Sequence, residues 1–166
     1  MSVSITAHVL VANEENWIWY SINSILKWVD KIIVWDTGST DKTVDIVKLI
    51  PSPKIQFSQK GLVDAHSHSQ LRQKMLEETS SDWFLILDGD EIWWQSSISQ
   101  VVKAIWKNPS KGAIISPFYN AVGDVFHYQK PSRSRYQIHH YRGSFTIRAI
   151  NRRLAVLKLT SYHGRQ

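Results

Sequence analysis

The stretch Trp83-Phe84-Leu85-Ile86-Leu87-Asp88-Gly89-Asp90-Glu91 decides how this chain folds. Five apolar residues, enough for a strand, lead directly into three carboxylates within four positions. Strands buried on both faces of a parallel sheet read as continuous apolar runs, and open α/β sheets bind ligands at the carboxyl ends of such strands. The stretch therefore predicts a central strand over residues 82–87 that ends at a binding edge.

The acidic loop after this strand favours a cation. Like charges crowded together repel one another unless positive charge lies among them. Carboxylate oxygens on a short loop suit Mg²⁺ or Mn²⁺, which in turn hold the phosphates of a substrate. The alternative is an acidic turn that only caps the following helix, expected over residues 96–107. Trp93 and Trp94 come next, where an indole face can stack on a bound ligand.

A second acidic loop follows another apolar run, over residues 31–35. It reads Asp36-Thr37-Gly38-Ser39-Thr40-Asp41 and consists of turn-forming and helix-capping residues. We expect a first strand over 3–11, a helix over 14–28 capped by Asn13, and a helix over 41–50. Both acidic loops should open on the same edge of a mostly parallel sheet, since each follows a buried strand.

The rest of the chain continues the alternation and then changes character. A strand over 54–57, a loop over 61–68 and a helix over 69–79 complete an α/β pattern of βαβ units. Further strands are expected over 112–117, 122–128, 144–150 and 154–159, and residues 129–143 read as a basic, aromatic loop. The length of 166 residues fits one domain, 1–166, in which the first half (1–95) carries the acidic motifs and the second half (96–166) carries most of the basic residues.

Composition and charge narrow the classes of function. The chain has no cysteine, no secretory signal pattern and no apolar run of membrane-spanning length, so we expect a cytoplasmic protein without a transmembrane segment. Residues 1–91 carry 8 Lys/Arg and 13 Asp/Glu (−5), whereas residues 92–166 carry 12 Lys/Arg and a single acid (+11). An acidic half joined to a basic half suits a polyanionic substrate. The alternative is a basic surface that contacts nucleic acid or an anionic membrane, but no nucleic-acid motif is present, and no nucleic-acid partner is expected.

These motifs resemble family 2 glycosyltransferases with the GT-A fold. The resemblance covers about residues 1–95: an Asn-Glu-Glu helix start at 13–15, the Asp-x-Gly-Ser-Thr-Asp loop at 36–41, and the Asp-Trp-apolar-Asp-x-Asp strand that begins at Asp82. It implies that 1–95 is the nucleotide-sugar-binding half and 96–166 the acceptor and diphosphate half, which is short for this fold. Gln73 stands where this family usually has asparagine after Arg72, and Ser81 replaces a usual glycine. The resemblance implies a metal-dependent transfer of a sugar, with inversion, from a nucleotide-diphosphate donor, most simply a UDP sugar.

The resemblance also implies roles for residues. The donor would be bound by the first two loops, by the acidic motif and by two arginines: Ala12, Asn13, Glu14, Asp36, Arg72, Asp88, Gly89, Asp90 and Arg148. Asp88, Asp90 and His163 would hold Mn²⁺ or Mg²⁺. Arg152 and Arg153 are further candidates for the diphosphate. The acceptor would be a saccharide, a lipid-linked molecule or a protein, with peripheral membrane contact as one option.

The catalytic base is the point where the sequence departs from the family. An inverting enzyme needs a base for the acceptor hydroxyl, and the single acid after Glu91 is Asp124. Asp124 or Glu91 is the candidate; the alternatives are another acid of the first half, or a base in sequence outside these 166 residues. Two other classes remain open: a domain that binds nucleotide or glycan without turnover, and a nucleotidyltransferase. The latter would carry a glycine-rich loop where this chain reads Ala-Asn-Glu-Glu.

Overall fold

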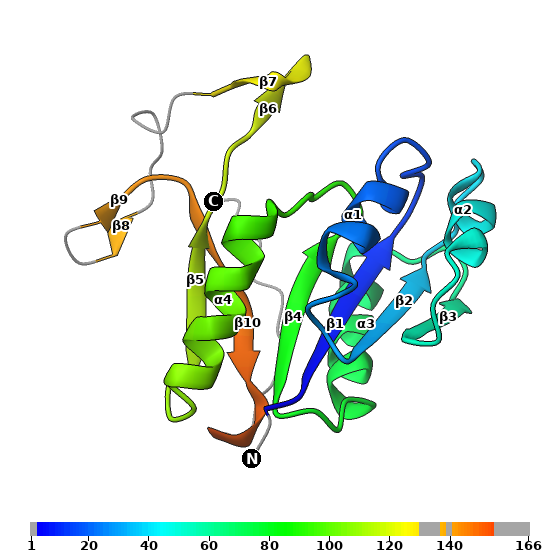
Figure 1. The fold of residues 1–166 in the computed structure, drawn as a ribbon. Helices are drawn as coiled ribbons and strands as arrows, with labels where there is room; N and C mark the ends of the chain where they lie inside the picture. The colour runs from blue at the N-terminus through cyan, green and yellow to red at the C-terminus, as the bar shows by residue number, and fades with distance from the viewer. Residues whose placement is uncertain (1–2, 130–136, 139–140, 155–166) are drawn as a thin grey trace.

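The computed structural model describes residues 3–129, 137–138 and 141–154. Its centre is a six-stranded sheet in the order β3-β2-β1-β4-β10-β5 (Figure 1). The strands are β1 (Ile5–Val11), β2 (Lys31–Asp36), β3 (Ile55–Gln59), β4 (Trp83–Asp88), β5 (Ala113–Pro117) and β10 (Phe145–Asn151). The helices are α1 (Ile18–Ile25), α2 (Thr43–Leu49), α3 (Ala65–Glu77) and α4 (Gln95–Lys107). Smaller elements are β6 (Ala121–Val122), β7 (Asp124–Tyr128), β8 (Gln137–Ile138), β9 (Tyr141–Arg142) and a 3₁₀ turn at Arg152–Leu154.

The strands β3, β2, β1 and β4 are parallel, whereas β10 runs antiparallel to both of its neighbours. This confirms the predicted α/β class with a mostly parallel central sheet. The register places Val11 beside Asp36 on one side of β1 and Leu10 beside Asp88 on the other. The two acidic loops therefore open on the same edge of the sheet, as predicted, with β1 between them.

Apolar side chains cover both faces of the sheet, which explains the continuous apolar runs of its strands. Successive residues of a strand point to opposite faces. In β2, Ile32 and Val34 join the larger core beneath α1, α2 and α4, while Ile33 and Trp35 join a smaller core with Leu71 and Met75 of α3. Helices thus lie on both faces of the parallel strands, and a ligand can approach these strands at their ends.

Three predicted boundaries are wrong for local reasons. The first helix begins at Ile18 rather than at residue 14, because Asn13 adopts a left-handed φ of 56° and does not cap it. The third begins at Ala65, within the predicted loop, because the Asp64 carboxylate accepts a hydrogen bond from the Ser67 N–H at 2.6 Å. The predicted strand over 122–128 is a hairpin of β6 and β7 that turns at Gly123 (φ 82°). The predicted strand over 154–159 lies almost wholly outside the described residues.

In the described part of the chain, no helix has the length and apolar character needed to cross a membrane.

Candidate active site

Three loops meet at the carboxyl edge of the sheet: residues 12–17 after β1, 37–42 after β2 and 89–94 after β4. They hold the candidate residues Ala12, Asn13, Glu14, Gly89 and Asp90. In Figure 1 these loops lie together at the upper end of the sheet. The predicted donor residues of the first half are therefore neighbours in space.

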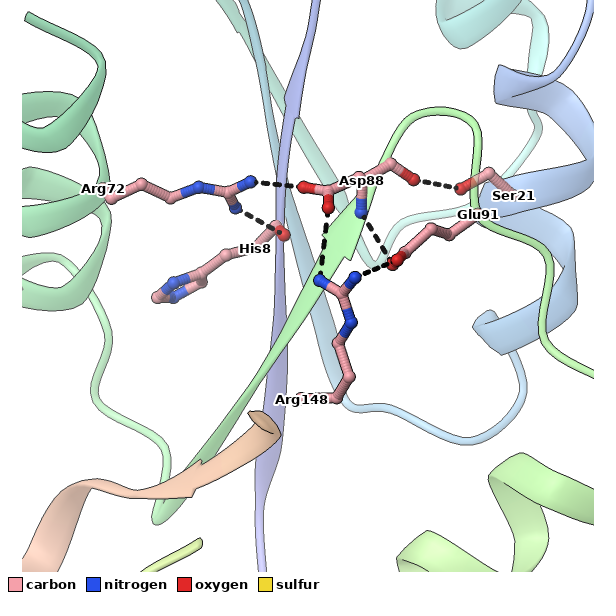
Figure 2. A network of polar contacts seen from close by, with 6 residues as sticks. All are labelled: His8, Ser21, Arg72, Asp88, Glu91 and Arg148. Carbon is pink, nitrogen blue, oxygen red and sulfur yellow. Dashed lines mark hydrogen bonds and ion pairs between the residues drawn. The ribbon is translucent and has the colours of Figure 1, made fainter. Parts of the chain in front are cut away.

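Asp88 is held by side chains from two separate elements (Figure 2). Arg72 of α3 donates from Nη2 to Asp88 Oδ1 at 2.8 Å, and Arg148 of β10 donates from Nη1 to Asp88 Oδ2 at 3.2 Å. The two arginine side chains are 13% and 14% exposed, whereas that of Asp88 is 45% exposed. Largely buried guanidinium groups thus hold a carboxylate that still faces solvent.

Arg72 is also anchored behind the sheet. Its Nη1 donates to the main-chain carbonyl of His8 in β1 at 3.2 Å. Figure 2 shows Arg72 reaching Asp88 from one side of the sheet, while Ser21 approaches the main chain of Asp88 from the other. In this structure, therefore, the Arg72 guanidinium is occupied by its hydrogen bonds to Asp88 and to the His8 carbonyl, and it is not free to contact a ligand at the carboxyl edge of the sheet.

Glu91 pairs with Arg148 and closes the network. The Arg148 Nη2 contacts Glu91 Oε1, and Glu91 Oε2 accepts a hydrogen bond from the Asp88 N–H at 3.3 Å. Burial raises the pKa of Glu91 to about 7; Arg148 opposes this effect and Asp88 adds to it. Arg148 therefore bridges two acids of the motif, and both oxygens of Glu91 are already engaged.

The first two loops are joined by hydrogen bonds between residues 26 to 29 positions apart. The Glu14 N–H donates to Thr43 Oγ1 at 2.7 Å, and the Asn13 N–H donates to Ser39 Oγ at 2.9 Å. The Asn13 side-chain oxygen accepts from the Thr40 N–H at 2.8 Å. These bonds satisfy main-chain donors of the two loops, which have no partner in a helix or a strand. Asn13, the predicted cap of the first helix, thus forms its side-chain hydrogen bond with the neighbouring loop instead.

Gly89 lets the acidic loop lie directly against the first loop. A Cβ placed on Gly89 would lie 2.8 Å from Val11 Cγ2 and 3.0 Å from Glu14 Cγ. Burial raises the pKa of Glu14, and Asp90 and Asp41 raise it further. The carboxylates of the two loops are therefore close enough to repel one another, and positive charge added at this edge would be favoured.

The side chain of Asp36 points into the loop that follows it. It is 1% exposed, and its carboxylate accepts hydrogen bonds from the main-chain N–H groups of Gly38 and Ser39 at 3.2 Å. Gly38 has a φ of 104°, which a side chain would disfavour. Asp36 therefore shapes the loop that borders the site.

For a metal ion, the described residues provide a pair of carboxylates. Asp90 is exposed and is separated from Asp88 by Gly89, while the third predicted ligand, His163, is outside the described residues. Over 3–129 and the shorter described segments, no group of three or more potential ligands of the Asp, Glu, His or Cys type occurs. Mg²⁺ and related ions are commonly bound through one or two carboxylates plus substrate phosphates, so this donor set fits such an ion.

The second half contributes Arg148 but not its neighbours. Asn151 pairs with Trp83 at the start of β4, so Arg152 and Arg153 lie at the opposite end of the strand from Asp88. Arg152 donates to the Ser81 carbonyl at 3.0 Å, and Arg153 pairs with Asp82. The prediction that these two arginines contact the diphosphate is not supported, because antiparallel β10 points them away from the site.

Asp124 lies on β7, outside the six-stranded sheet. Its carboxylate accepts from the Phe126 N–H at 2.8 Å and from the ring of His127 at 2.8 Å. These hydrogen bonds, that of His127 first, lower the pKa of Asp124. In this structure Asp124 thus contacts its own hairpin.

Sequence reasoning missed Ser21. Its hydroxyl donates to the main-chain carbonyl of Asp88 at 3.1 Å and so fixes the end of β4 on α1. A signal was present: Ser21 lies on the face of α1 that Ile18, Ile22 and Ile25 occupy, where a polar residue needs a partner.

The model for "Glycosyl transferase family 2" matches residues 6–161, nearly the whole chain. This chain belongs to glycosyl transferase family 2. Among curated relatives of this family member, the prophage-derived glycosyltransferase SunS of Bacillus subtilis is 29% identical over 118 residues. That match covers 69% of this chain and 27% of SunS, so the chain spans about a quarter of its relative.

Solved structures show the same fold. A fragment of Staphylococcus aureus TarS in complex with UDP aligns with a TM-score of 0.58 at 19% identity, covering 80% of this chain and 40% of the other. The mannosyltransferase PcManGT from Pyrobaculum calidifontis, in complex with GDP-Man and Mn²⁺, aligns with a TM-score of 0.57 at 20% identity, covering 72% and 36%. The family 2 chain thus has the GT-A fold that its motifs implied.

A small cavity of about 220 Å³ lies at the other end of the sheet, between the end of α4 and the start of β5. Trp83, Asn108, Lys111 and Ile114 are among the residues that line it. Because Trp83 begins β4 and Asp88 ends it, this cavity is separate from the site of the family 2 motifs.

Proposed function

We propose that this chain binds a nucleotide-diphosphate sugar at the carboxyl edge of β1, β2 and β4 and transfers the sugar to an acceptor. The observation that carries the proposal is Asp88, a solvent-facing carboxylate held by two largely buried guanidinium groups and followed by the exposed Asp90. Carboxylates fixed in this way can hold a divalent cation, and the cation in turn can bind a diphosphate without reorganisation of the site during the reaction. Family membership supports the same reading.

The donor is proposed to lie across the three loops. Its nucleoside would lie against Ala12, Asn13 and the Asp36 loop, and its diphosphate beside Asp88, Gly89 and Asp90. We infer a uridine nucleotide because the fold neighbour TarS was crystallised with UDP. Arg72 and Arg148 would keep Asp88 in place while the donor binds.

A divalent cation, Mn²⁺ or Mg²⁺, would be held by Asp90 and Asp88 and would stabilise the negative charge of the leaving diphosphate. His163 remains a proposed third ligand. The neighbour PcManGT was crystallised with Mn²⁺. Burial first, and then like-charge repulsion from Asp90, raises the pKa of Glu14, and this repulsion also favours a cation here.

The transfer is proposed to invert the anomeric centre. An acceptor hydroxyl would attack the anomeric carbon, the bond from that carbon to the diphosphate oxygen would break, and its electron pair would leave with the nucleoside diphosphate. The proton of the hydroxyl would pass to a carboxylate base, Asp124 or Glu91. Because Glu91 holds Arg148, Glu91→Gln should weaken donor binding, whereas Asp124→Asn should stop transfer without changing donor binding if Asp124 is the base.

Binding without turnover is the second candidate. It is favoured by one observation: among the described residues, both proposed bases are already engaged, Glu91 with Arg148 and Asp124 with its own hairpin. A nucleotidyltransferase is disfavoured, since the loop after β1 has no glycine-rich phosphate cradle.

Calorimetric titration of UDP, GDP, CDP and dTDP, first with Mn²⁺ and then with EDTA, tests the proposal. We expect one nucleotide to bind in a metal-dependent manner, and Asp90→Asn to weaken it by about tenfold or more. The matched control is Asp45→Asn, an exposed acid on α2, which should bind like the wild type. If a folded sample binds none of the four nucleotides, the proposal is wrong.

A further inference from the structure

Three exposed aromatic rings form a continuous surface beside the acidic motif. Trp94, at the start of α4, lies with its ring centroid 5.6 Å from that of Tyr119, and Tyr119 lies 4.9 Å from Tyr128 of β7. Their exposed fractions are 62%, 49% and 56%. We call these three residues the aromatic platform. Large rings that stay open to solvent while contacting one another mark an interaction surface.

Helix α1 fixes the position of the aromatic platform relative to the carboxyl edge of the sheet, where the sugar donor is proposed to bind. Ser21 donates its hydroxyl to the Asp88 carbonyl at 3.1 Å, and Ser24 accepts a hydrogen bond from the Trp93 N–H at 3.1 Å. These serines are three residues apart, a rise of about 4.5 Å along the helix. The start of the platform at Trp94 is therefore fixed about one helical turn from the end of β4.

The other two rings come from the segment that leaves β5. The Phe118 N–H donates to the Ser144 carbonyl at 3.0 Å, and the Gln129 N–H donates to the Asn120 carbonyl at 2.9 Å. These bonds close the base of the hairpin, with Tyr119 and Tyr128 beside them. In Figure 1 the hairpin rises past the upper end of α4, the end of the sheet where β1 and β4 also finish.

The charge of this surface is unusual for the chain. The whole chain carries +6, and its second half is strongly basic. Residues 92–102 and 112–129 nevertheless contain no Lys or Arg and only one acid, Asp124. Asp124 is engaged with the main chain of its hairpin and with His127. Within these two described stretches, a surface without Lys or Arg is poorly suited to an anionic lipid or a nucleic acid.

The chemistry of the rings points to a particular class of ligand. Trp and Tyr combine an apolar ring face with an N–H or O–H at the rim. Gln95, Asn120 and Gln129 add amide groups nearby in the chain. A sugar ring has the complementary pattern, with apolar C–H faces and a rim of hydroxyl groups, and binding sites typically join apolar faces to a few such polar groups.

We propose that the aromatic platform of Trp94, Tyr119 and Tyr128 binds a neutral saccharide, the acceptor of the transfer. The inference rests on the proposed function, because it makes this saccharide the molecule that receives the sugar. The rings would stack on the sugar faces and hold the acceptor beside the Asp88–Glu91 loop.

The test uses the intrinsic tryptophan fluorescence and NMR spectra of the full chain, titrated with chitotriose, cellotriose and maltotriose at millimolar concentration. We expect at least one trisaccharide to bind, and Trp94→Ala to weaken that binding by about tenfold, a change of about 1.4 kcal/mol. The matched control is Trp106→Ala, which removes an equally exposed tryptophan (60%) from the other end of the same helix and should bind like the wild type.

Tyr119→Phe and Tyr128→Phe keep the ring contacts and remove only the hydroxyl groups, so smaller losses are expected from them. No binding of any trisaccharide to the folded wild type would overturn the inference, as would equal binding by Trp94→Ala. Binding to vesicles of anionic lipid that requires Trp94, without saccharide binding, would also overturn it in favour of a membrane surface.

A separate titration of the wild type with UDP, GDP, CDP and dTDP in the presence of Mn²⁺ keeps the two proposals apart. Saccharide binding that depends on Trp94, in a chain that binds no nucleotide, would support the platform and contradict the transferase. Nucleotide binding without saccharide binding would support the transferase and contradict the platform.

Discussion

Arg148 and Asp88 are 60 positions apart in the chain, yet the guanidinium of one lies 3.2 Å from the carboxylate of the other. The pair joins the antiparallel strand β10 to the end of the parallel strand β4, and the same guanidinium also contacts Glu91. The acidic motif is thus completed by a residue from the other half of the molecule.

Replacing this guanidinium tests its role. We expect Arg148→Lys to weaken UDP binding in the presence of Mn²⁺ by about tenfold, because a single ammonium group cannot contact Asp88 and Glu91 in the planar, two-pronged manner of arginine. The measurement is isothermal titration calorimetry. Arg153→Lys is the control, because Arg153 is 64% exposed and pairs with Asp82 at the far end of β4. Equal affinities for the two variants would contradict the role of Arg148.

Gly89→Ala tests the close approach of the acidic loop to the first loop. The new methyl group would lie 2.8 Å from the Cγ2 of the buried Val11, which has no room to move. We expect the free energy of unfolding to fall by about 1–3 kcal/mol, together with weaker nucleotide binding. Urea unfolding measures the first effect. Gly112→Ala should leave stability nearly unchanged, since a Cβ there meets nothing within 4 Å; a comparable loss there would refute the packing argument.

Thr43→Val tests the bonds between the first two loops. This near-isosteric change removes the buried hydroxyl that accepts from the Glu14 N–H at 2.7 Å. We expect a loss of about 1–3 kcal/mol in the free energy of unfolding, because the Glu14 N–H is left without its partner. Thr40→Val is the comparison: its hydroxyl is exposed, and the Asn13 oxygen that it contacts keeps the Thr40 N–H as a donor. A similar loss in both variants would argue against this assignment.

His8 predicts a pH dependence of stability. This fully buried ring stacks on Phe84, its Nε2 lies 2.6 Å from Thr79 Oγ1, and the Thr79 hydroxyl donates onward to the Met75 carbonyl. Burial above all, and then Arg72 and Lys31, lowers the pKa of His8 from 6.5 to about 3. The unfolded chain therefore takes up a proton near pH 6.5, and the folded chain does not until about pH 3.

The contribution of His8 to stability is thus present above pH 6.5 and is lost as the pH falls toward 3. Between these values it should change by up to about 1.4 kcal/mol per pH unit. We expect His8→Gln, which does not titrate, to flatten the pH dependence of unfolding measured by urea denaturation between pH 7 and about pH 4. Identical slopes for wild type and variant would show that His8 is protonated in the folded chain.

Local sequence determined the elements that carry the first half of the site. The run Trp83–Leu87 could only be a strand covered on both faces, and the Asp-x-Asp motif had to follow it at the edge of the sheet. The Asp36 loop had to share that edge, because both strands are parallel and buried. Periodicity and loop chemistry are properties of neighbouring residues, so they can be read without a structure.

The first residues of the helices were less predictable, because each depends on one side chain that can form hydrogen bonds with more than one main-chain segment. Asn13 has the right chemistry for a cap but binds Thr40 of the adjacent loop instead, and Asp64 caps a helix that the sequence suggested would begin later. Each choice is decided by the geometry of a second segment, which the local sequence does not contain.

The sequence by itself determined the fold class, the family motifs and the end of the sheet where the acids gather. Only the tertiary structure decided which charges meet there. Arg148 lies beside the acidic motif, whereas Arg152 and Arg153 lie at the opposite end of β4. The register of the antiparallel strand β10 causes this difference. The tertiary structure also placed Arg72 behind Asp88 and joined Trp94 to Tyr119 and Tyr128. Strand register and long-range pairing arise from packing across the whole chain, and for that reason they are absent from any single stretch of sequence.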